Sequence, residues 1–149
     1  MHLGHVAQAD ARWRIYAFAG KADSSRPGSA IHKLADWLEN DSHSPIVRHT
    51  RKGEDVDAVI DFRAVFQQTF DQLAYEDMPS LLKPRTGKLG LQDHEKVFCV
   101  DHKGWGDIYD MRGIDRNQGC MIVVRPDQYV AHVLPLNGFD ELSSYFGAI

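Results

Sequence analysis

The fold of this chain is decided by the stretch Arg112-Gly-Ile-Asp-Arg-Asn-Gln-Gly-Cys-Met-Ile-Val-Val-Arg-Pro-Asp-Gln-Tyr-Val-Ala-His-Val-Leu-Pro-Leu136. Residues 121–124 form a continuous apolar run, which is typical of a strand covered on both faces. Pro126 presets φ for the second position of a type I turn, and Asp127 tolerates the third. Residues 129–134 resume the apolar pattern until Pro135 ends it. The stretch therefore predicts a β-hairpin.

The N-terminal part predicts a strand, a helix and a second strand. Residues 13–19 alternate and are rich in aromatic side chains, which favours a core strand. A polar loop over residues 20–28 follows, and Ser29 is a good N-cap for the next helix. Residues 40–43 end that helix, and residues 56–62 predict the second strand. The apolar stripe of the helix consists of Ile31, Leu34, Ala35 and Leu38.

Weaker patterns fill the middle of the chain. Residues 43–55 are polar and predict a solvated loop. Residues 64–73 favour irregular structure or a short helix, and residues 77–82 favour a short helix that Pro84 stops. Residues 96–100 predict a short strand, and residues 108–111 a further extended piece.

The resulting order is β-α-β, an irregular middle, and β-β-α in a single domain over residues 1–149. Asn137 and Gly138 open the last helix, in which Phe139, Leu142, Tyr145 and Phe146 share a face. A parallel βαβ unit followed by an antiparallel hairpin and a closing helix is thioredoxin-like topology, although other α/β arrangements also fit the pattern. We therefore expect an α/β fold with a mixed central sheet flanked by helices.

The hairpin also resembles that of a known family. Val123-Val-Arg-Pro-Asp-Gln-Tyr-Val130 is similar to the last hairpin of the C-terminal, thioredoxin-like dimerisation domain of FAD-dependent aromatic hydroxylases. Many of these hydroxylases carry Gly where Gln128 stands and an aromatic-Arg pair where His132-Val133 stand. These differences point to the group of phenol 2-monooxygenase and 3-hydroxybenzoate 4-monooxygenase. Similar segments elsewhere in the chain are His2-Leu-Gly-His5, Trp13-Arg-Ile-Tyr16, Asp57-Ala-Val-Ile-Asp61 and Lys96-Val-Phe-Cys99.

The resemblance implies a parent enzyme that uses FAD and NADPH, but no FAD site is expected in this chain. A dinucleotide-binding turn needs Gly-x-Gly-x-x-Gly after a strand, so that the backbone can approach the pyrophosphate. The glycines of residues 20–106 lack that spacing. We therefore predict no catalytic and no cofactor-binding residue, and we expect the isolated chain to be inactive as a monooxygenase.

The two cysteines, Cys99 and Cys120, lie in apolar runs and predict buried, inert thiols. A dithiol oxidoreductase would carry Cys-x-x-Cys at the start of the first long helix, but residues 21–29 contain no cysteine. A thiol peroxidase that uses Cys99 stays open as a weaker alternative.

No metal site is expected. The candidate ligands are paired in sequence, and no spacing fixes the third ligand that most sites need. These pairs are His2-x-x-His5, Asp93-His94 and Asp101-His102.

Two further groups of charged residues are better explained by structural roles than by catalytic ones. Arg125, Pro126 and Asp127 are explained better by a turn and its hydrogen bonds than by catalysis. Asp57 and Asp61 lie four residues apart and would point to one face of a strand. We interpret them as a solvated strand margin and not as an acid/base pair.

Charge and hydropathy exclude several classes of partner. The net charge of −4, with Arg and Lys scattered along the chain, argues against a dedicated nucleic-acid binder. No apolar run approaches the ~20 residues that span a bilayer. Residues 1–10 lack the pattern of a secretory signal, so the cytoplasm is the expected compartment.

The sequence leaves two functions open. In the first, the chain is a non-catalytic domain of a phenol or hydroxybenzoate monooxygenase that forms a homodimer or docks to the flavoprotein. The aromatic stripes would then supply core packing, and part of them a contact surface. In the second, the chain is a stand-alone thioredoxin-fold protein that binds a small aromatic or anionic ligand. Its site would lie between residues 21–29 and the turn at residues 125–128, near the first helix N-terminus.

Overall fold

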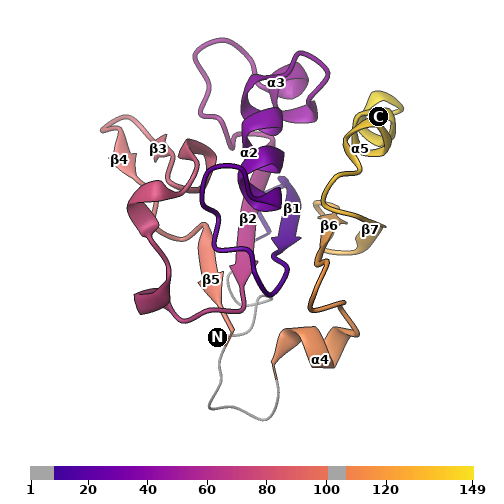
Figure 1. Ribbon diagram of the computed structural model, residues 1–149. Helices are drawn as coiled ribbons and strands as arrows, with labels where there is room; N and C mark the ends of the chain where they lie inside the picture. The colour runs from indigo at the N-terminus through magenta and orange to yellow at the C-terminus, as the bar shows by residue number, and fades with distance from the viewer. Residues whose placement is uncertain (1–8, 101–106) are drawn as a thin grey trace.

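A mixed five-stranded sheet in the order β5-β2-β1-β6-β7 forms the centre of the computed structural model, which describes residues 9–100 and 107–149 (Figure 1). β1 runs parallel to β2 and antiparallel to β6, and β2 runs parallel to β5. β6 and β7 form the predicted hairpin. The strands are β1 (Trp13–Phe18), β2 (Ile60–Phe66), β5 (Val97–Cys99), β6 (Cys120–Val124) and β7 (Val130–Leu134), and a separate small ribbon consists of β3 (Arg85–Thr86) and β4 (Leu91–Gln92). The α/β class is thus confirmed.

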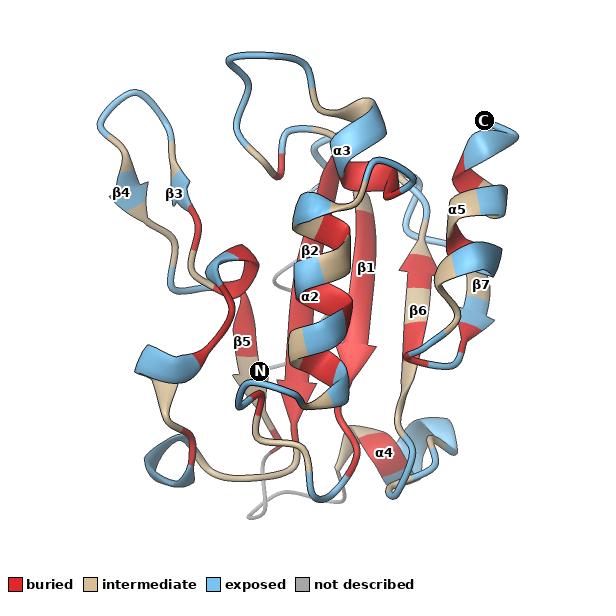
Figure 2. Ribbon diagram, turned by 45° about the horizontal axis from the view of Figure 1, so that its top comes forward, coloured by how far each residue is buried: buried red, intermediate tan, exposed pale blue. Residues whose placement is uncertain are grey.

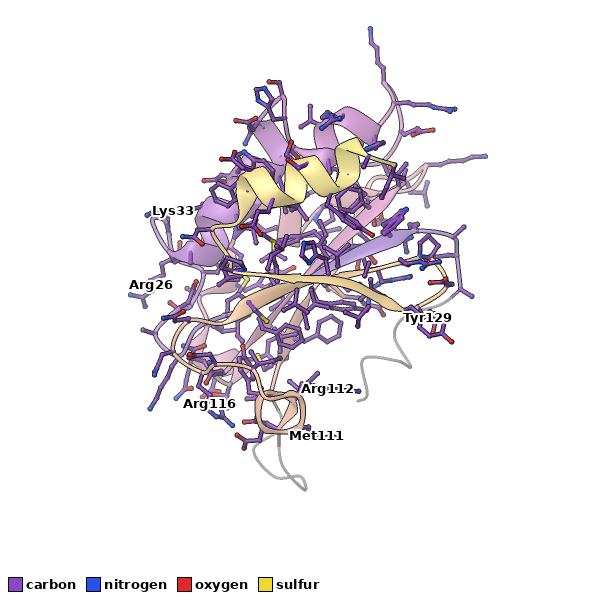
Figure 3. All side chains as sticks on the ribbon, turned by 90° about the vertical axis from the view of Figure 1, so that its right-hand side faces the viewer. Arg26, Lys33, Met111, Arg112, Arg116 and Tyr129 are labelled. Carbon is purple, nitrogen blue, oxygen red and sulfur yellow. The ribbon has the colours of Figure 1, made fainter. Side chains whose placement is uncertain are left out.

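Helices cover the two faces of the sheet unequally. α2 (Ala30–Asn40) and α5 (Phe139–Gly147) lie on one face, here called the helix face, and α4 (Ile108–Arg112) lies on the other, here called the α4 face (Figure 3). The remaining elements are α3 (Pro45–His49) and the short 3-10 turns η1 (Phe70–Gln72), η2 (Tyr75–Asp77) and η3 (Ser80–Leu82). No helix within the described ranges combines the length and apolar character needed to cross a membrane.

The main core lies between the sheet and the helix face. The predicted stripe of α2 is buried there, together with Leu142 and Phe146 of α5. A second, smaller core on the α4 face is built around Tyr16, Phe18 and Tyr109. Figure 2 shows β1 and β2 buried almost throughout, whereas β7 is only partly buried.

The second strand was predicted four residues too early. Residues 56–62 were expected to form it, but β2 covers Ile60–Phe66 and its first residue aligns with Trp13 of β1. Asp61 and Arg63 lie inside this strand and are buried. Because charged residues normally indicate solvent, their presence hid the second half of the strand, and residues 64–66 were predicted to be irregular.

Two short helices were also predicted wrongly. The solvated loop expected over residues 43–55 contains α3, which Ser44 caps through a hydrogen bond from the Ile46 N–H and in which Pro45 takes the first position. The extended piece expected at residues 108–111 is α4. Asp107 caps its start, and Gly113 ends it in the left-handed conformation at φ 64°.

The remaining middle segment is partly as expected. The short helix predicted over residues 77–82 is present only as the 3-10 turns η2 and η3, and the strand predicted over residues 96–100 is confirmed as β5.

The hairpin turn explains one difference from the family pattern. Gln128 has φ 70°, and its N–H donates to the carbonyl oxygen of Arg125 at 2.8 Å. This left-handed conformation favours glycine, which is the residue that many related hydroxylases carry there.

Gly119 should be the glycine that tolerates substitution least. It has φ 65°, and a Cβ there would collide with the carbonyl oxygen of Phe18. We expect Gly119→Ala to lower the free energy of unfolding by about 2–5 kcal/mol, measured by urea denaturation. Gly90→Ala is the control, because its φ is 60° but no atom lies within 4 Å of the added carbon. A loss of about 1–2 kcal/mol is expected for it, and equal losses in both variants would contradict the collision.

Candidate functional site

A cluster of buried charges lies on the α4 face around Asp61, which is fully buried. Lys96 Nζ donates to Asp61 Oδ1 at 2.5 Å and to Asp57 Oδ2 at 2.7 Å. Arg63 Nε donates to Asp61 Oδ2 at 2.9 Å. The two carboxylates therefore share one buried ammonium group.

Arg14 of β1 and Arg12, which immediately precedes this strand, complete the charge cluster. Arg12 Nη1 donates to Asp57 Oδ2 at 3.0 Å, and Arg14 Nε lies 3.5 Å from Asp61 Oδ2. Arg14 Nη2 also donates to Asp10 Oδ2 at 2.9 Å. The register places Arg14 beside Asp61, so both side chains leave the sheet on the same face.

The prediction that Asp57 and Asp61 form a solvated strand margin is wrong. Both are buried and paired with cations, and only Asp61 lies within the strand. Burial acts to raise the pKa of Asp57, but the hydrogen bond from Lys96 and the charges of Lys96 and Arg12 lower it below its ordinary value. A carboxylate held in this way is a poor general base, which favours a structural role for the cluster.

Lys96 is the member that the sequence interpretation missed. Burial acts to lower the pKa of its ammonium group, but the charges and hydrogen bonds of Asp61 and Asp57 raise it. The sequence feature that could have indicated a buried charge cluster was a lysine at the start of an apolar run, together with Arg14 and Arg63 inside apolar strands. Such charges need buried partners, and Asp57 and Asp61 are the acidic residues nearest to β2 in sequence.

The two thiols give no support to thiol chemistry. Both side chains are half-buried, and burial raises the pKa of Cys99 to about 11 and raises that of Cys120 as well. Few thiolates therefore form at neutral pH. The cysteines lie on β5 and β6, which two strands separate. Three strand spacings amount to about 14 Å, too far for a disulfide.

The described part of the chain contains no group of three metal-ligating side chains close enough to hold an ion. His94 instead meets the hydroxyl of Tyr75, 3.2 Å from its Nδ1. His2, His5 and the pair Asp101-His102 lie outside the described residues.

The predicted ligand site between residues 21–29 and 125–128 is wrong. β1 and β6 are antiparallel with Arg14 beside Val124, so the hairpin turn lies at the start of β1 and residues 21–29 follow its end. Six residues of strand separate the two segments by roughly 20 Å. Asp23 already accepts the N–H of Ile31 in the first turn of α2, which neutralises this helix N-terminus.

Arg125 and Asp127 lie in the exposed hairpin turn. Their side chains form an ion pair of 2.7 Å, and Asp127 Oδ1 accepts the N–H of Tyr129 at 3.3 Å. These contacts fit the turn interpretation.

The aromatic stripes are core residues. Trp13 packs edge-on against Phe146 with ring centroids 5.3 Å apart, and Trp37 stacks on Phe139 at 4.9 Å. Trp13 of the early stripe thus covers the last helix on the helix face, whereas Tyr16 and Phe18 are buried in the smaller core of the α4 face.

One exposed apolar surface lies on the hairpin. β7 is the outer strand of the sheet, and its sequence Val-Ala-His-Val-Leu contains no charged residue and no proline. The side chains of Tyr129, Val130 and Val133 are 72%, 61% and 56% exposed. Isolated exposed apolar residues are ordinary, but a contiguous set on one edge marks an interaction site.

A β-bulge aligns these side chains. Val133 lies opposite Ile122 and Val130 opposite Val124, with a register shift between these pairs. Residues opposite each other share a face, and Ile122 and Val124 pack against the core of the α4 face. Val130 and Val133 would point to opposite faces of a regular strand, but the bulge places both on the α4 face. We call Ile122, Val124, Val130 and Val133 the hairpin strip.

Comparison with known proteins identifies the family. Residues 1–149 match the family described as "Phenol hydroxylase, C-terminal dimerisation domain", and the chain belongs to it. The chain is 51% identical over 147 residues to 3-hydroxybenzoate 4-monooxygenase of Comamonas testosteroni, covering 98% of this chain and 23% of that protein. It is 30% identical over 149 residues to FAD-dependent monooxygenase terD of Aspergillus terreus, covering 98% of this chain and 24% of that protein.

A more distant relative gives the same coverage. The chain is 24% identical over 155 residues to phenol 2-monooxygenase fsqG of Aspergillus fumigatus, covering 97% of this chain and 23% of that protein. The chain thus spans about a quarter of the length of these relatives.

The charge cluster predicts a large stability loss when Asp61 is neutralised. We expect Asp61→Asn to lower the free energy of unfolding by about 3–5 kcal/mol, because Lys96 and Arg63 stay buried without their counter-charge. Urea denaturation at pH 7 measures it. Asp127→Asn, which breaks the exposed pair with Arg125, should cost about 1 kcal/mol or less. A loss no greater in Asp61→Asn than in Asp127→Asn would refute the structural role.

The same cluster predicts a loss of stability in acid. Burial acts to raise the pKa of Asp10, but the hydrogen bonds and charges of Arg12 and Arg14 lower it from 3.8 to about 2. A lowered pKa in the folded state stabilises the protein above the unfolded pKa, and this stabilisation is lost as pH falls through the folded pKa. The urea midpoint of the wild type should therefore exceed that of Asp10→Asn at pH 6, and the difference should vanish near pH 2. A constant difference would contradict this linkage.

Proposed function

We propose that this chain forms the homodimer contact of an FAD- and NADPH-dependent monooxygenase that hydroxylates a hydroxybenzoate or a phenol. The observation that carries the proposal is the match of the whole chain to a C-terminal dimerisation domain, at about a quarter of the length of its relatives. The exposed, uncharged edge of β7 supports it, because such an edge favours association with another chain.

The chemistry is assigned to the rest of the longer protein. Both cysteine thiols have raised pKa values. The carboxylates of Asp57 and Asp61 are bound by Lys96. The carboxylates are thus engaged in holding the fold, and the thiols stay protonated at neutral pH. We infer that none of these groups acts on a substrate or on FAD. The 51% identity to 3-hydroxybenzoate 4-monooxygenase favours a hydroxybenzoate as the substrate of the parent enzyme.

We further infer a thioredoxin-like fold and a cytoplasmic parent enzyme. β1, α2 and β2 form a parallel βαβ unit, and the hairpin β6–β7 followed by α5 completes the expected order. The two cysteines are unpaired, which suits a reducing compartment.

Two measurements on the purified chain test this function. Light scattering after gel filtration should give twice the 16.9 kDa of one chain. After incubation with FAD and removal of the free cofactor, the protein should retain no flavin, and it should not oxidise NADPH when 3-hydroxybenzoate is added. The full-length 3-hydroxybenzoate 4-monooxygenase of Comamonas testosteroni serves as the positive control for both flavin retention and turnover. A monomer at every concentration would refute homodimerisation, and retained flavin or turnover would refute the non-catalytic role.

A further inference from the structure

We propose that two copies of this chain join edge to edge along β7, antiparallel, so that their sheets become one continuous sheet. This inference rests on the proposed homodimerisation and adds to it the surface and the register. The occupant of the edge is a second copy of the same chain, because the family to which residues 1–149 belong is described as a dimerisation domain.

The backbone of β7 has an open side. Within residues 9–100 and 107–149, the strand pairs only with β6. The N–H of Val133 donates to Nδ1 of the neighbouring His132 side chain at 3.1 Å, so it points away from β6. A strand of another chain offers a backbone carbonyl as a better aligned acceptor for such a donor. Natural edge strands are protected by a short length, a β-bulge, a lysine, a proline or a covering element. β7 is short and pairs with β6 through a bulge, but its sequence contains no lysine and no proline.

The opposite edge of the sheet is less suitable. β5 has three residues, of which Val97 is buried and Phe98 and Cys99 are half-buried. The guanidinium of Arg63 lies over the ring of Phe98, 5.9 Å from its centroid. The apolar side chains of this strand are therefore engaged within the protein, whereas Val130 and Val133 of β7 are exposed.

A two-fold axis midway between the two β7 strands makes the edge complementary to itself. If the axis passes between Ala131 and His132, Val130 of one copy lies opposite Val133 of the other, and the same pair repeats across the axis. Residues opposite each other in an antiparallel pair share a face, and the bulge has already placed Val130 and Val133 on the α4 face. The valines of both copies then form one apolar cluster, extended by Ile122 and Val124. A contact of this kind is isologous, as two-fold dimers require.

Neighbouring exposed side chains enlarge the contact. A stable interface buries roughly 1,000 Å² or more in total, and a five-residue strand alone provides less. Tyr129 immediately precedes β7 and is 72% exposed, and Figure 3, which views this side of the molecule, shows it at the end of the strand. We include it in the contact surface.

Repulsion between acidic residues of the two copies weakens the β7–β7 contact only slightly. Asp140 and Glu141 of α5 line a shallow depression together with His132, Ser144 and Tyr145 on the helix face. The axis brings the depressions of the two copies to the same side of the joined sheet. The like charges are solvent-exposed, and at physiological salt their repulsion is screened beyond about 8 Å. The apolar cluster forms on the opposite face and does not contact them.

Charged edge variants test the surface. Val130→Lys combined with Val133→Lys should convert the dimer into a monomer and weaken dimerisation at least ~100-fold by sedimentation equilibrium, because four ammonium groups would meet across the axis. Leu89→Lys is the matched control, since Leu89 is 84% exposed but lies in the turn between β3 and β4. The control should remain dimeric. Circular dichroism should keep the wild-type shape in both variants, because each replaced side chain is exposed. The control should also keep the wild-type urea midpoint, whereas the double variant should unfold at the midpoint of the wild type diluted until it is monomeric, because it has lost only the stabilisation that association adds.

Cysteine cross-linking tests the register. Val130→Cys combined with Val133→Cys should give a disulfide-linked dimer on a non-reducing gel after mild oxidation, because the opposed Cβ atoms lie about 4.5–5.5 Å apart. Either single variant should give little cross-linked dimer, since identical residues lie apart across the axis. The native thiols of Cys99 and Cys120 are half-buried, and the wild type serves as their control.

The outcomes separate the two proposals. A wild-type chain that stays monomeric refutes the homodimer and the edge contact together. A wild-type dimer that survives both lysines and does not cross-link through the paired cysteines refutes the edge contact and leaves the homodimer standing. Docking of the parent flavoprotein domain on β7 would appear as a monomeric chain and would likewise overturn the inference.

Discussion

Asp61 holds three neighbouring strands in register through charge. It lies on β2 beside Arg14 of β1, and it accepts a hydrogen bond from Lys96, the residue immediately before β5. Burying these ions costs several kcal/mol each, so the net stability that the cluster adds is small even though breaking it is costly. Its main consequence is specificity. A slip of β2 by one residue would turn Asp61 toward the apolar helix face, where no cation could meet it.

The charge cluster and the hairpin divide the α4 face of the sheet between them. On the α4 face, charges occur on β1, β2 and the approach to β5, whereas β6 contributes Cys120, Ile122 and Val124. The same face of β7 carries only Val130 and Val133. On the α4 face, ion pairs thus set the register of the inner strands, and apolar side chains continue from β6 to the outer strand β7. A domain organised in this way can be rigid at its centre and still present an uncharged surface to a partner.

Local sequence patterns identified the elements that bury apolar side chains in the ordinary way. The hairpin, the stripe of α2 and the face of α5 could all be predicted from periodicity and turn residues. The position of β2 and the burial of Asp57 could not, because a periodicity argument treats every charge as solvated and the partner Lys96 is 39 residues away. The helices α3 and α4 have N-cap residues, Ser44 and Asp107, that the sequence shows. Each helix spans only five residues, which is too short for an apolar periodicity to indicate it. Exposure of the hairpin strip depends on the bulge, which sequence does not reveal.

An exposed apolar edge strand promotes aggregation unless the copies that it joins form a closed assembly with no free edge left to extend. Pairing of β7 with another β7 uses the same edge on both copies, so the joined sheet ends at the β5 edge of each copy. That edge is short and its side chains are engaged, so a third copy has no matching surface to extend. Pairing of β7 with β5 would instead be head-to-tail and would generate open fibres. The difference between the two edges therefore favours a closed dimer over aggregation.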